Sequence, residues 1–195
     1  MLYNMRTTAR GGGARDLERY FGDANVGGGV FSTDVGLAGQ TIIIWPHEGL
    51  DSYGAARNQS EGGRGAAGVD QYGKHELEVL ELAPFMEPLK PEQIGRVWEL
   101  TWYDYPPGAV PEALKAFEAA LPYRQEKSRI VGIWSVAVGF ALDRIYYLAA
   151  YKDWNQRDEV VSALKKDGTW PPKTKDAAIS GGSKLLQAAR FSPLR

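Results

Sequence analysis

The chain repeats one order of secondary structure twice, and this internal repeat limits the possible folds more than any other feature. The first copy starts with the strand-like segment "LYNMRTTARGGG" at Leu2, and the second with "VWELTWYDYPPG" at Val97. A helical stretch follows in each copy, "ARDLERYFGDA" and "PEALKAFEAAL". In the second stretch, apolar residues recur with the period of a helix. Such self-similarity indicates one structural unit built twice.

The middle of each copy is a predicted β-hairpin. The segment "GGVFSTDVGLAGQTIIIW" aligns with "VGIWSVAVGFALDRIYYL", so that Ser32 matches Ser135 and Gly36 matches Gly139. A second helical stretch follows, "SYGAARNQ" in one copy and "NQRDEVVSALKK" in the other, and a strand closes each copy. Each copy therefore has the order β-α-β-β-α-β, which is that of a ferredoxin-like fold.

We predict an α+β protein of two ferredoxin-like halves, residues 1–90 and 95–195, each with a four-stranded antiparallel sheet. A proline-bearing connector, "EPLKPEQIGR", joins them. Helices cover one face of each sheet, and the other face needs a partner sheet. Two such sheets face to face enclose a barrel-like space, and a barrel of about eight strands can hold one small ligand. The sequence leaves open whether the partner sheet belongs to the same chain.

The amino-acid composition limits the kinds of molecule that the protein is expected to bind. The 195 residues are 44% hydrophobic and 24% charged, as in soluble globular proteins. A net charge of −1 offers no basic excess for nucleic acid. The chain has no cysteine, and it shows no signal peptide and no membrane-spanning run. We expect a cytoplasmic protein without nucleic-acid or membrane partners. We also expect no metal or other cofactor, since His47 and His75 have no known ligand spacing.

Three segments resemble the NIPSNAP family of the dimeric α/β-barrel superfamily. They are "VWELTWYDYPPG", "IVGIWSVAVGFALDRIYYLAAYKDWNQR" and the terminal "ARFSPLR". The first half resembles the family through "YNMRT", "IIIWPHEGL" and "APFMEPL". The resemblance implies a ferredoxin-like fold and a barrel of paired sheets. It implies no single reaction, because relatives include cofactor-free monooxygenases, cyclases, isomerases, haem-using enzymes and ligand binders.

The resemblance also implies that the family's pocket motifs are divided between the halves. The family strand His-Leu-Trp-x-Tyr keeps Trp45 in the first half, with His47 at the tyrosine position. In the second half it has Tyr147 at the histidine position and keeps Tyr151. The family's opening strand, Glu-Leu-Arg-Thr-Tyr, is divided in the same way: Arg6 and Asn4 stand in one half, and Glu99 and Thr101 in the other.

Strand alternation sorts these residues by face. In the strand at 97, we expect the apolar set to meet the helices and the alternate set, which includes Glu99, to face the enclosed space. The apolar set is Trp98, Leu100 and Trp102, and the alternate set is Glu99, Thr101 and Tyr103. The repeat places Asn4 and Arg6 with Glu99. We place the sets containing Trp45 and Tyr147 inside as well. The expected pocket is aromatic with a few polar groups, as small-molecule sites are.

His47 is the expected acid/base, because imidazole exchanges protons near neutral pH. Asp34 on the neighbouring strand is expected to orient it, and Glu99 is the next carboxylate. The expected substrate-binding residues are Arg6, Asn4, Trp45, Tyr147, Tyr151 and Trp134. Non-functional alternatives stay open. His47 could be an exposed residue at a strand end, and Arg6 could pair with Glu99 across the barrel. The aromatic residues could serve only as packing.

Three functions fit this sequence. The first is a metal-independent enzyme that cyclises, isomerises or oxygenates a small apolar or aromatic metabolite by proton transfer. The second is a module that binds such a ligand, or haem, without turnover. The third is a structural or assembly protein with a filled interior. Open sheet edges invite pairing, and members of the family commonly associate, so the expected assembly is a homodimer.

Overall fold

The second half of the chain has the predicted order of elements. A computed structural model of the protein describes residues 1–8, 18, 27–52, 54, 55 and 75–195. Its C-terminal half contains β5 (Val97–Asp104), α4 (Val110–Lys127), β6 (Arg129–Val138), β7 (Arg144–Tyr151), α5 (Trp154–Asp167) and β8 (Ser180–Ala188). The N-terminal half contains β1 (Leu2–Thr8), β2 (Gly29–Val35), β3 (Thr41–His47) and β4 (His75–Leu82). Of the two helices expected in that half, the first falls outside the described residues except for Glu18, and the second is seen in part, since residues 50–52, 54 and 55 are helical.

Local sequence explains where the two C-terminal helices begin and end. Helix α4 has proline at its start and buries Phe117 on its sheet-facing side. Helix α5 is capped by the side chain of Asp153, which accepts a hydrogen bond from the backbone N–H of Gln156 at 2.9 Å. It ends at Gly168, whose φ of 65° is a left-handed conformation that suits glycine. Among the described residues, no helix is both long and apolar enough to cross a bilayer.

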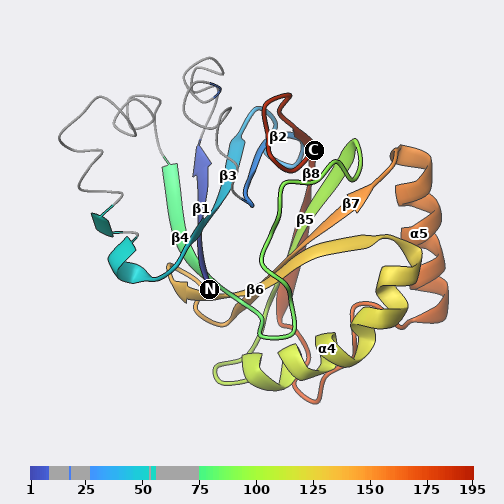
Figure 1. Cartoon of the computed structure of the whole chain (residues 1–195). Helices are drawn as coiled ribbons and strands as arrows, with labels where there is room; N and C mark the ends of the chain where they lie inside the picture. The colour runs from blue at the N-terminus through green and yellow to red at the C-terminus, as the bar shows by residue number, and fades with distance from the viewer. Residues whose placement is uncertain (9–17, 19–26, 53, 56–74) are drawn as a thin grey trace.

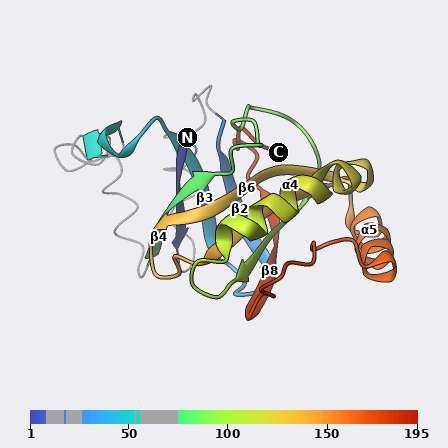
Figure 2. The ribbon, with the colours of Figure 1, turned by 90° about the horizontal axis from the view of Figure 1, so that it is seen from below.

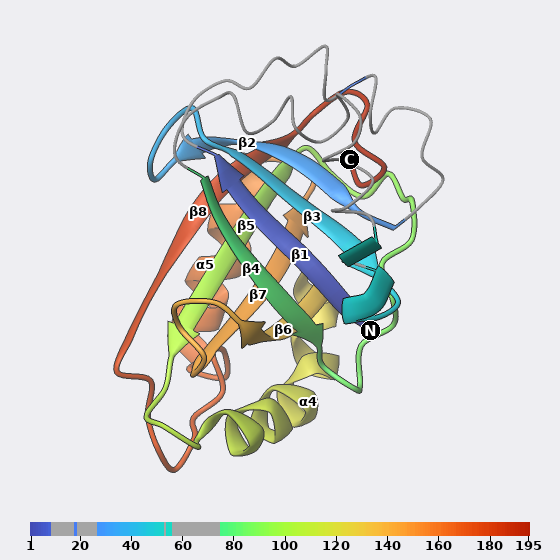
Figure 3. The same ribbon diagram turned by 90° about the vertical axis from the view of Figure 1, so that its left-hand side faces the viewer.

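The eight strands form one closed antiparallel barrel, in the order β1-β3-β2-β8-β5-β7-β6-β4. Each half contributes four adjacent strands in the ferredoxin-like order, β4-β1-β3-β2 and β8-β5-β7-β6. Pairs β2·β8 and β4·β6 join the two sheets at both seams. Figure 3 shows β4, β1, β3 and β2 in front of the sheet of the second half. The predicted fold class is confirmed, and the partner sheet comes from the same chain.

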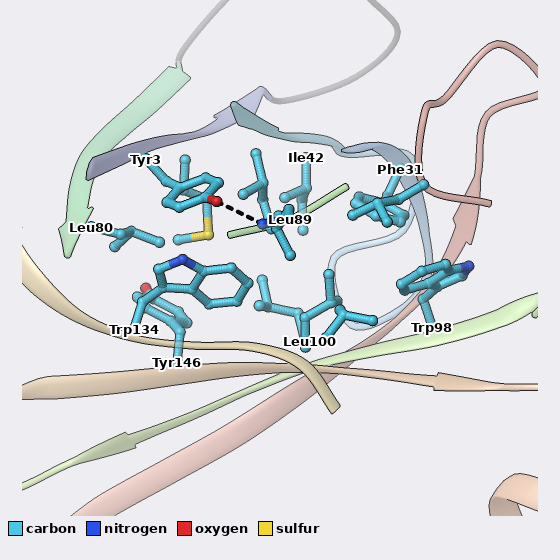
Figure 4. Close-up of a cluster of buried hydrophobic side chains, with 14 of the residues drawn as sticks. Tyr3, Phe31, Ile42, Leu80, Leu89, Trp98, Leu100, Trp134 and Tyr146 are labelled. Carbon is cyan, nitrogen blue, oxygen red and sulfur yellow. Dashed lines mark hydrogen bonds between the residues drawn. The ribbon is translucent and has the colours of Figure 1, made fainter. Parts of the chain in front are cut away.

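Helices α4 and α5 lie outside the barrel, over the sheet of the C-terminal half (Figures 1 and 2). A first buried cluster fills the barrel itself, and a second lies between this sheet and the two helices. Figure 4 shows side chains of both halves meeting inside the barrel, with Tyr3 from β1 and Trp134 from β6 among them. These two rings lie edge to face, with centroids 5.7 Å apart.

The faces assigned to the strands from sequence are wrong, because the structure inverts them. Trp98 and Leu100 point into the barrel, while Glu99, Tyr147 and Tyr151 lie on the outer, helix-covered face. An eight-stranded barrel is just wide enough for large side chains to fill its interior. The bulky apolar set therefore fills the barrel, and the mixed polar and aromatic set lies under the helices.

Candidate functional site

A pocket with titratable walls lies outside the barrel, beneath the helices of the C-terminal half. Its volume is about 370 Å³. Strands β5, β7 and β8 form one wall, and Arg124 of α4, residues of α5 and the segment Trp170–Pro171 form the rest. The lining residues are Glu99, Thr101, Tyr103, Arg124, Tyr147, Tyr151, Arg157, Val161, Leu164, Lys165, Trp170, Pro171, Gly181, Gly182 and Ser183.

A buried carboxylate and a guanidinium form the centre of this pocket. Arg157 Nη2 lies 2.8 Å from Glu99 Oε1, and Arg157 Nε lies 3.1 Å from Glu99 Oε2. The pairing is bidentate, which is the strongest geometry for these two groups. Hydrogen bonding to Glu99 raises the pKa of Arg157. Glu99 is only 6% exposed, so Arg157 provides the countercharge that a buried carboxylate requires.

A second guanidinium joins the same network through a phenol. Arg124 is 1% exposed, and its Nη2 donates to Tyr151 Oη at 3.0 Å. The Tyr151 hydroxyl donates in turn to Glu99 Oε2 at 3.4 Å. Burial raises the pKa of Tyr151 above the range of a free tyrosine, so its hydroxyl stays protonated at neutral pH. The chain Arg124–Tyr151–Glu99–Arg157 carries two positive charges and one negative charge, and Lys165 adds another positive charge to the lining.

Two donors in the pocket wall are unsatisfied. Arg124 Nη1 bonds to the carbonyl and the hydroxyl of Ser128, at 3.0 and 2.6 Å. Within the described ranges, however, Arg124 Nε and the indole Nε1 of Trp170 have no hydrogen-bond partner. An unmade hydrogen bond of a buried donor costs about 1–3 kcal/mol. Both residues line the pocket, but these two nitrogens are closed off from solvent, so the acceptor deficit lies within the wall itself.

Aromatic rings form the apolar wall of the pocket. Tyr147 packs edge to face against Trp170, with centroids 5.4 Å apart, and Phe117 packs against the same indole at 5.0 Å. The ring centroids of Tyr103 and Tyr147 are 6.3 Å apart. Burial, followed by the neighbouring Tyr147, raises the pKa of Tyr103, which therefore remains a neutral phenol. The pocket thus combines flat apolar surface with hydroxyl donors and net positive charge.

The structure brings together three of the nine predicted site residues in this pocket and places the other six elsewhere. Glu99, Tyr147 and Tyr151 line the pocket beneath the helices. Trp134 does not, because it is fully buried inside the barrel as a packing residue. The alternative in which Arg6 pairs with Glu99 across the barrel is wrong, since Glu99 pairs with Arg157 instead.

Four predicted residues lie on the corresponding outer face of the other half. Asn4 is opposite Trp45 in the β1·β3 register, as Glu99 is opposite Ala149 in β5·β7. Arg6 shares that face, and His47, opposite Leu2, occupies the position that Tyr151 has opposite Val97. These side chains are partly buried, and burial lowers the pKa of His47. They form a separate surface and do not join the pocket of the C-terminal half.

Asp34 lies too far from His47 to orient it. Gly29 is opposite Ile44 in the β2·β3 register, so Asp34 and His47 lie at opposite ends of the hairpin. The separation is eight residue steps, roughly 26 Å along the strands. Asp34 Oδ2 instead accepts a hydrogen bond from Gln187 Nε2 of β8 at 2.6 Å.

Sequence reasoning missed Arg124, Arg157 and Trp170. One signal was available, because a buried Glu99 needs a cation and both helices of the same half carry arginine. The sequence provided no means to choose among those arginines. Trp170 follows α5 in a proline-rich turn and reaches the pocket only because that segment folds back over β7.

The C-terminal half of the chain is similar to a known protein family. The family model described as NIPSNAP matches residues 98–193. Protein NipSnap homolog 3A of Homo sapiens is 33% identical over 76 residues, which are 39% of this chain and 31% of the human protein. Protein NipSnap homolog 3B of Mus musculus is 29% identical over a segment of the same length and coverage. The matched segment thus spans about a third of these curated relatives.

Two solved structures share the whole barrel. A proposed monooxygenase from Fusobacterium nucleatum superposes with a TM-score of 0.66 at 13% identity, covering 96% of this chain and 91% of the other. A protein from Lactobacillus acidophilus with a similar description gives a TM-score of 0.61 at 10% identity, covering 96% and 93%. At these identities the likeness extends to the fold alone.

Proposed function

The C-terminal half of this chain is a NIPSNAP domain, and from that premise we propose that its pocket binds a small oxygen-bearing aromatic metabolite and acts on it by proton transfer. The reaction is a cyclisation, an isomerisation or an oxygenation without a bound metal or organic cofactor. The site differs from the one expected from sequence, because the barrel interior is filled by side chains. It lies instead between the sheet and the helices.

The observation that carries this proposal is the pairing of aromatic wall and positively charged network in one pocket. Tyr147 and Trp170 offer surface to a flat ring. Arg124 Nη2, which uses one of its two N–H groups on Tyr151, and the ammonium group of Lys165 offer donors to an oxygen of the ligand. The three reaction types share one early step, which is the loss of a proton to give an anion delocalised onto that oxygen. Fixed donors and positive charge in a buried site stabilise such an anion.

Glu99 is the group in this pocket that can accept the proton, because it is the carboxylate of the lining. Its bidentate pairing with Arg157 also favours a second candidate function, binding without turnover, because a carboxylate engaged on both oxygens is a weaker base. His47 remains a proposed acid/base only for the separate outer face of the N-terminal half.

A binding experiment tests the site without knowledge of the natural substrate. Hydroxynaphthoate supplies a flat ring and an anionic oxygen, and naphthalene supplies the ring alone. We expect hydroxynaphthoate to bind and Arg124→Met to weaken its binding about tenfold or more, since a charge-assisted hydrogen bond contributes about 1.5–3 kcal/mol. Isothermal titration calorimetry measures the dissociation constants, and a thermal melt verifies that the variant is folded.

Two matched comparisons make this result specific. Arg129→Met removes an exposed arginine outside the pocket and should leave the affinity unchanged. If Arg124→Met does not fold, Lys165→Met removes another positive charge from the lining. Equal binding of naphthalene and hydroxynaphthoate, or equal affinity in the pocket variants and the wild type, would contradict the proposed site.

We also propose that the protein is a cytoplasmic homodimer. Because the barrel closes within one chain, a dimer must form through its outer surface. Phe140, in the turn between β6 and β7, is 91% exposed, and Leu142 in the same turn is 59% exposed. We expect light scattering to give twice the mass of one chain and Phe140→Ser to reduce it to one. A wild-type protein that remains monomeric at high concentration would refute the dimer.

A further inference from the structure

A second small cavity opens at one end of the barrel. Its volume is about 100 Å³, which is room for about three water molecules. Met5 and Leu100 contribute its apolar lining, and Glu76, Glu78, Arg144, Tyr146 and Lys184 contribute most of its polar lining. None of these residues lines the pocket beneath the helices, so the two sites are distinct.

Glu78 and Lys184 occupy equivalent positions in the two halves. Glu78 is opposite Met5 in the β1·β4 register, and Lys184 is opposite Leu100 in the β5·β8 register. Met5 and Leu100 are themselves the fourth residues of β1 and β5. The surrounding turns are equivalent too: a Cβ on Gly139 would lie 3.0 Å from Glu78 Oε1, and a Cβ on Gly36 would lie 3.1 Å from Lys184 Cγ.

This equivalence explains why such a site requires a chain with two unlike halves. Two identical ferredoxin-like subunits would place the same residue at both positions, and like charges would face one another across the cavity. Here a carboxylate and an ammonium group line the same cavity. The two halves thus provide a charge asymmetry that a symmetric barrel cannot have.

Among the residues that the structure describes, no cation bonds to the buried Glu78. It is 8% exposed, and its Oε2 accepts a hydrogen bond from the hydroxyl of Tyr146 at 2.7 Å. Arg144 Nη1 donates to the same Tyr146 oxygen at 3.0 Å. The guanidinium of Arg144 is, however, paired with Asp104, through Nε to Oδ1 at 2.6 Å and Nη2 to Oδ2 at 3.1 Å. A buried carboxylate with only a phenol as bonded partner is incompletely compensated.

Lys184 is similarly incomplete on the opposite side of the cavity. Its ammonium can donate three hydrogen bonds, and it makes one to Gln40 Oε1 at 3.1 Å. In the part of the chain that the structure describes, no ion pair joins Lys184 to Glu78 or Glu76. Burial lowers the pKa of Lys184, whereas the nearby charges of Glu76 and Glu78 act in the opposite direction.

We propose that the barrel mouth binds a small carboxylate that also carries a hydrogen-bond donor, such as a 2-hydroxy or 2-amino acid of five or six non-hydrogen atoms. Its carboxylate contacts Lys184, and its hydroxyl or ammonium group donates to Glu78. The cavity is too small for the aromatic ligand of the other pocket. The site therefore provides a separate binding function at the junction of the two halves.

The proposal is tested by titrating the full chain with four small probes. Glycolate and glycine carry both groups, acetate lacks the donor, and ethanolamine lacks the carboxylate. We expect glycolate, glycine or both to bind in roughly the millimolar range, because so few atoms limit the affinity. Acetate and ethanolamine should bind about tenfold more weakly. Two-dimensional NMR can follow the indole N–H signal of Trp102, which lines the same cavity.

Variants assign the binding to the two charges. Lys184→Met and Glu78→Gln should each weaken binding of the best probe about tenfold or more, while Lys166→Met, on the exposed side of α5, should have no effect. Glu78→Gln keeps an oxygen for Tyr146, so it guards against loss of the fold. The absence of binding by all four probes, meaning that the cavity holds water only, would overturn the proposal. Equal affinity in Lys184→Met would overturn it as well.

Discussion

Glu99→Gln is expected to slow proton abstraction by about two to four decades, which is the usual contribution of a general base. Anthrone is a suitable probe, because it is flat, carries one carbonyl oxygen and has acidic CH₂ protons. Loss of the CH₂ signal in D₂O, followed by NMR, measures the rate. Glutamine can still accept hydrogen bonds from Arg157, so the fold and the binding of hydroxynaphthoate should persist.

His47→Ala is the matched control for this experiment. His47 lies on the outer face of the other half, so its loss should leave the exchange rate unchanged if Glu99 is the base. If His47→Ala loses the exchange rate and Glu99→Gln keeps it, the proton-accepting group lies in the N-terminal half. If the wild-type protein binds hydroxynaphthoate but does not accelerate exchange, binding without turnover is the better description of the pocket.

Trp134→Ala is expected to lower the free energy of unfolding by about 3–5 kcal/mol, as for other buried tryptophans replaced by alanine. Trp134 is fully buried and packs against Tyr3 of the opposite sheet, so its removal leaves a cavity where the two halves meet. For a chain of this length, the melting temperature should fall by roughly 6–20 °C. Urea unfolding followed by circular dichroism gives the free energy directly.

Trp154→Ala provides the comparison, because Trp154 starts α5 and is 42% exposed. Its replacement should change stability by no more than about 0.5 kcal/mol. Since Trp134 lies outside the pocket beneath the helices, affinity for hydroxynaphthoate should survive in Trp134→Ala at temperatures where the variant is folded. A loss of stability below about 1 kcal/mol would mean that the barrel interior is not the packed core that joins the two halves.

The sequence by itself determined the unit of the fold. The matched strands at Leu2 and Val97, and the hairpins with Gly36 and Gly139 at equivalent turns, predicted the order of elements that the C-terminal half shows. The register confirms the alignment residue by residue, since Asn4 and Glu99 occupy the same place in their sheets. Local periodicity and turn chemistry suffice for this, because they depend on neighbours along the chain.

Only the tertiary structure decided which face of each strand is the inside. Alternation separates Trp98 and Leu100 from Glu99 and Thr101, yet all four are buried, so hydrophobicity could not assign the faces. The width of the closed barrel decides which face is inside, because an eight-stranded barrel is just wide enough for large side chains to fill it.

The partners of the charged groups were also beyond the sequence. Arg157 reaches Glu99 from a helix that crosses the sheet. Glu78 and Lys184 line one cavity only because strands from both halves close the barrel. The hydrophobic pattern of a strand indicates that the strand will be buried. The residues that it packs against depend on contacts between segments far apart in the chain.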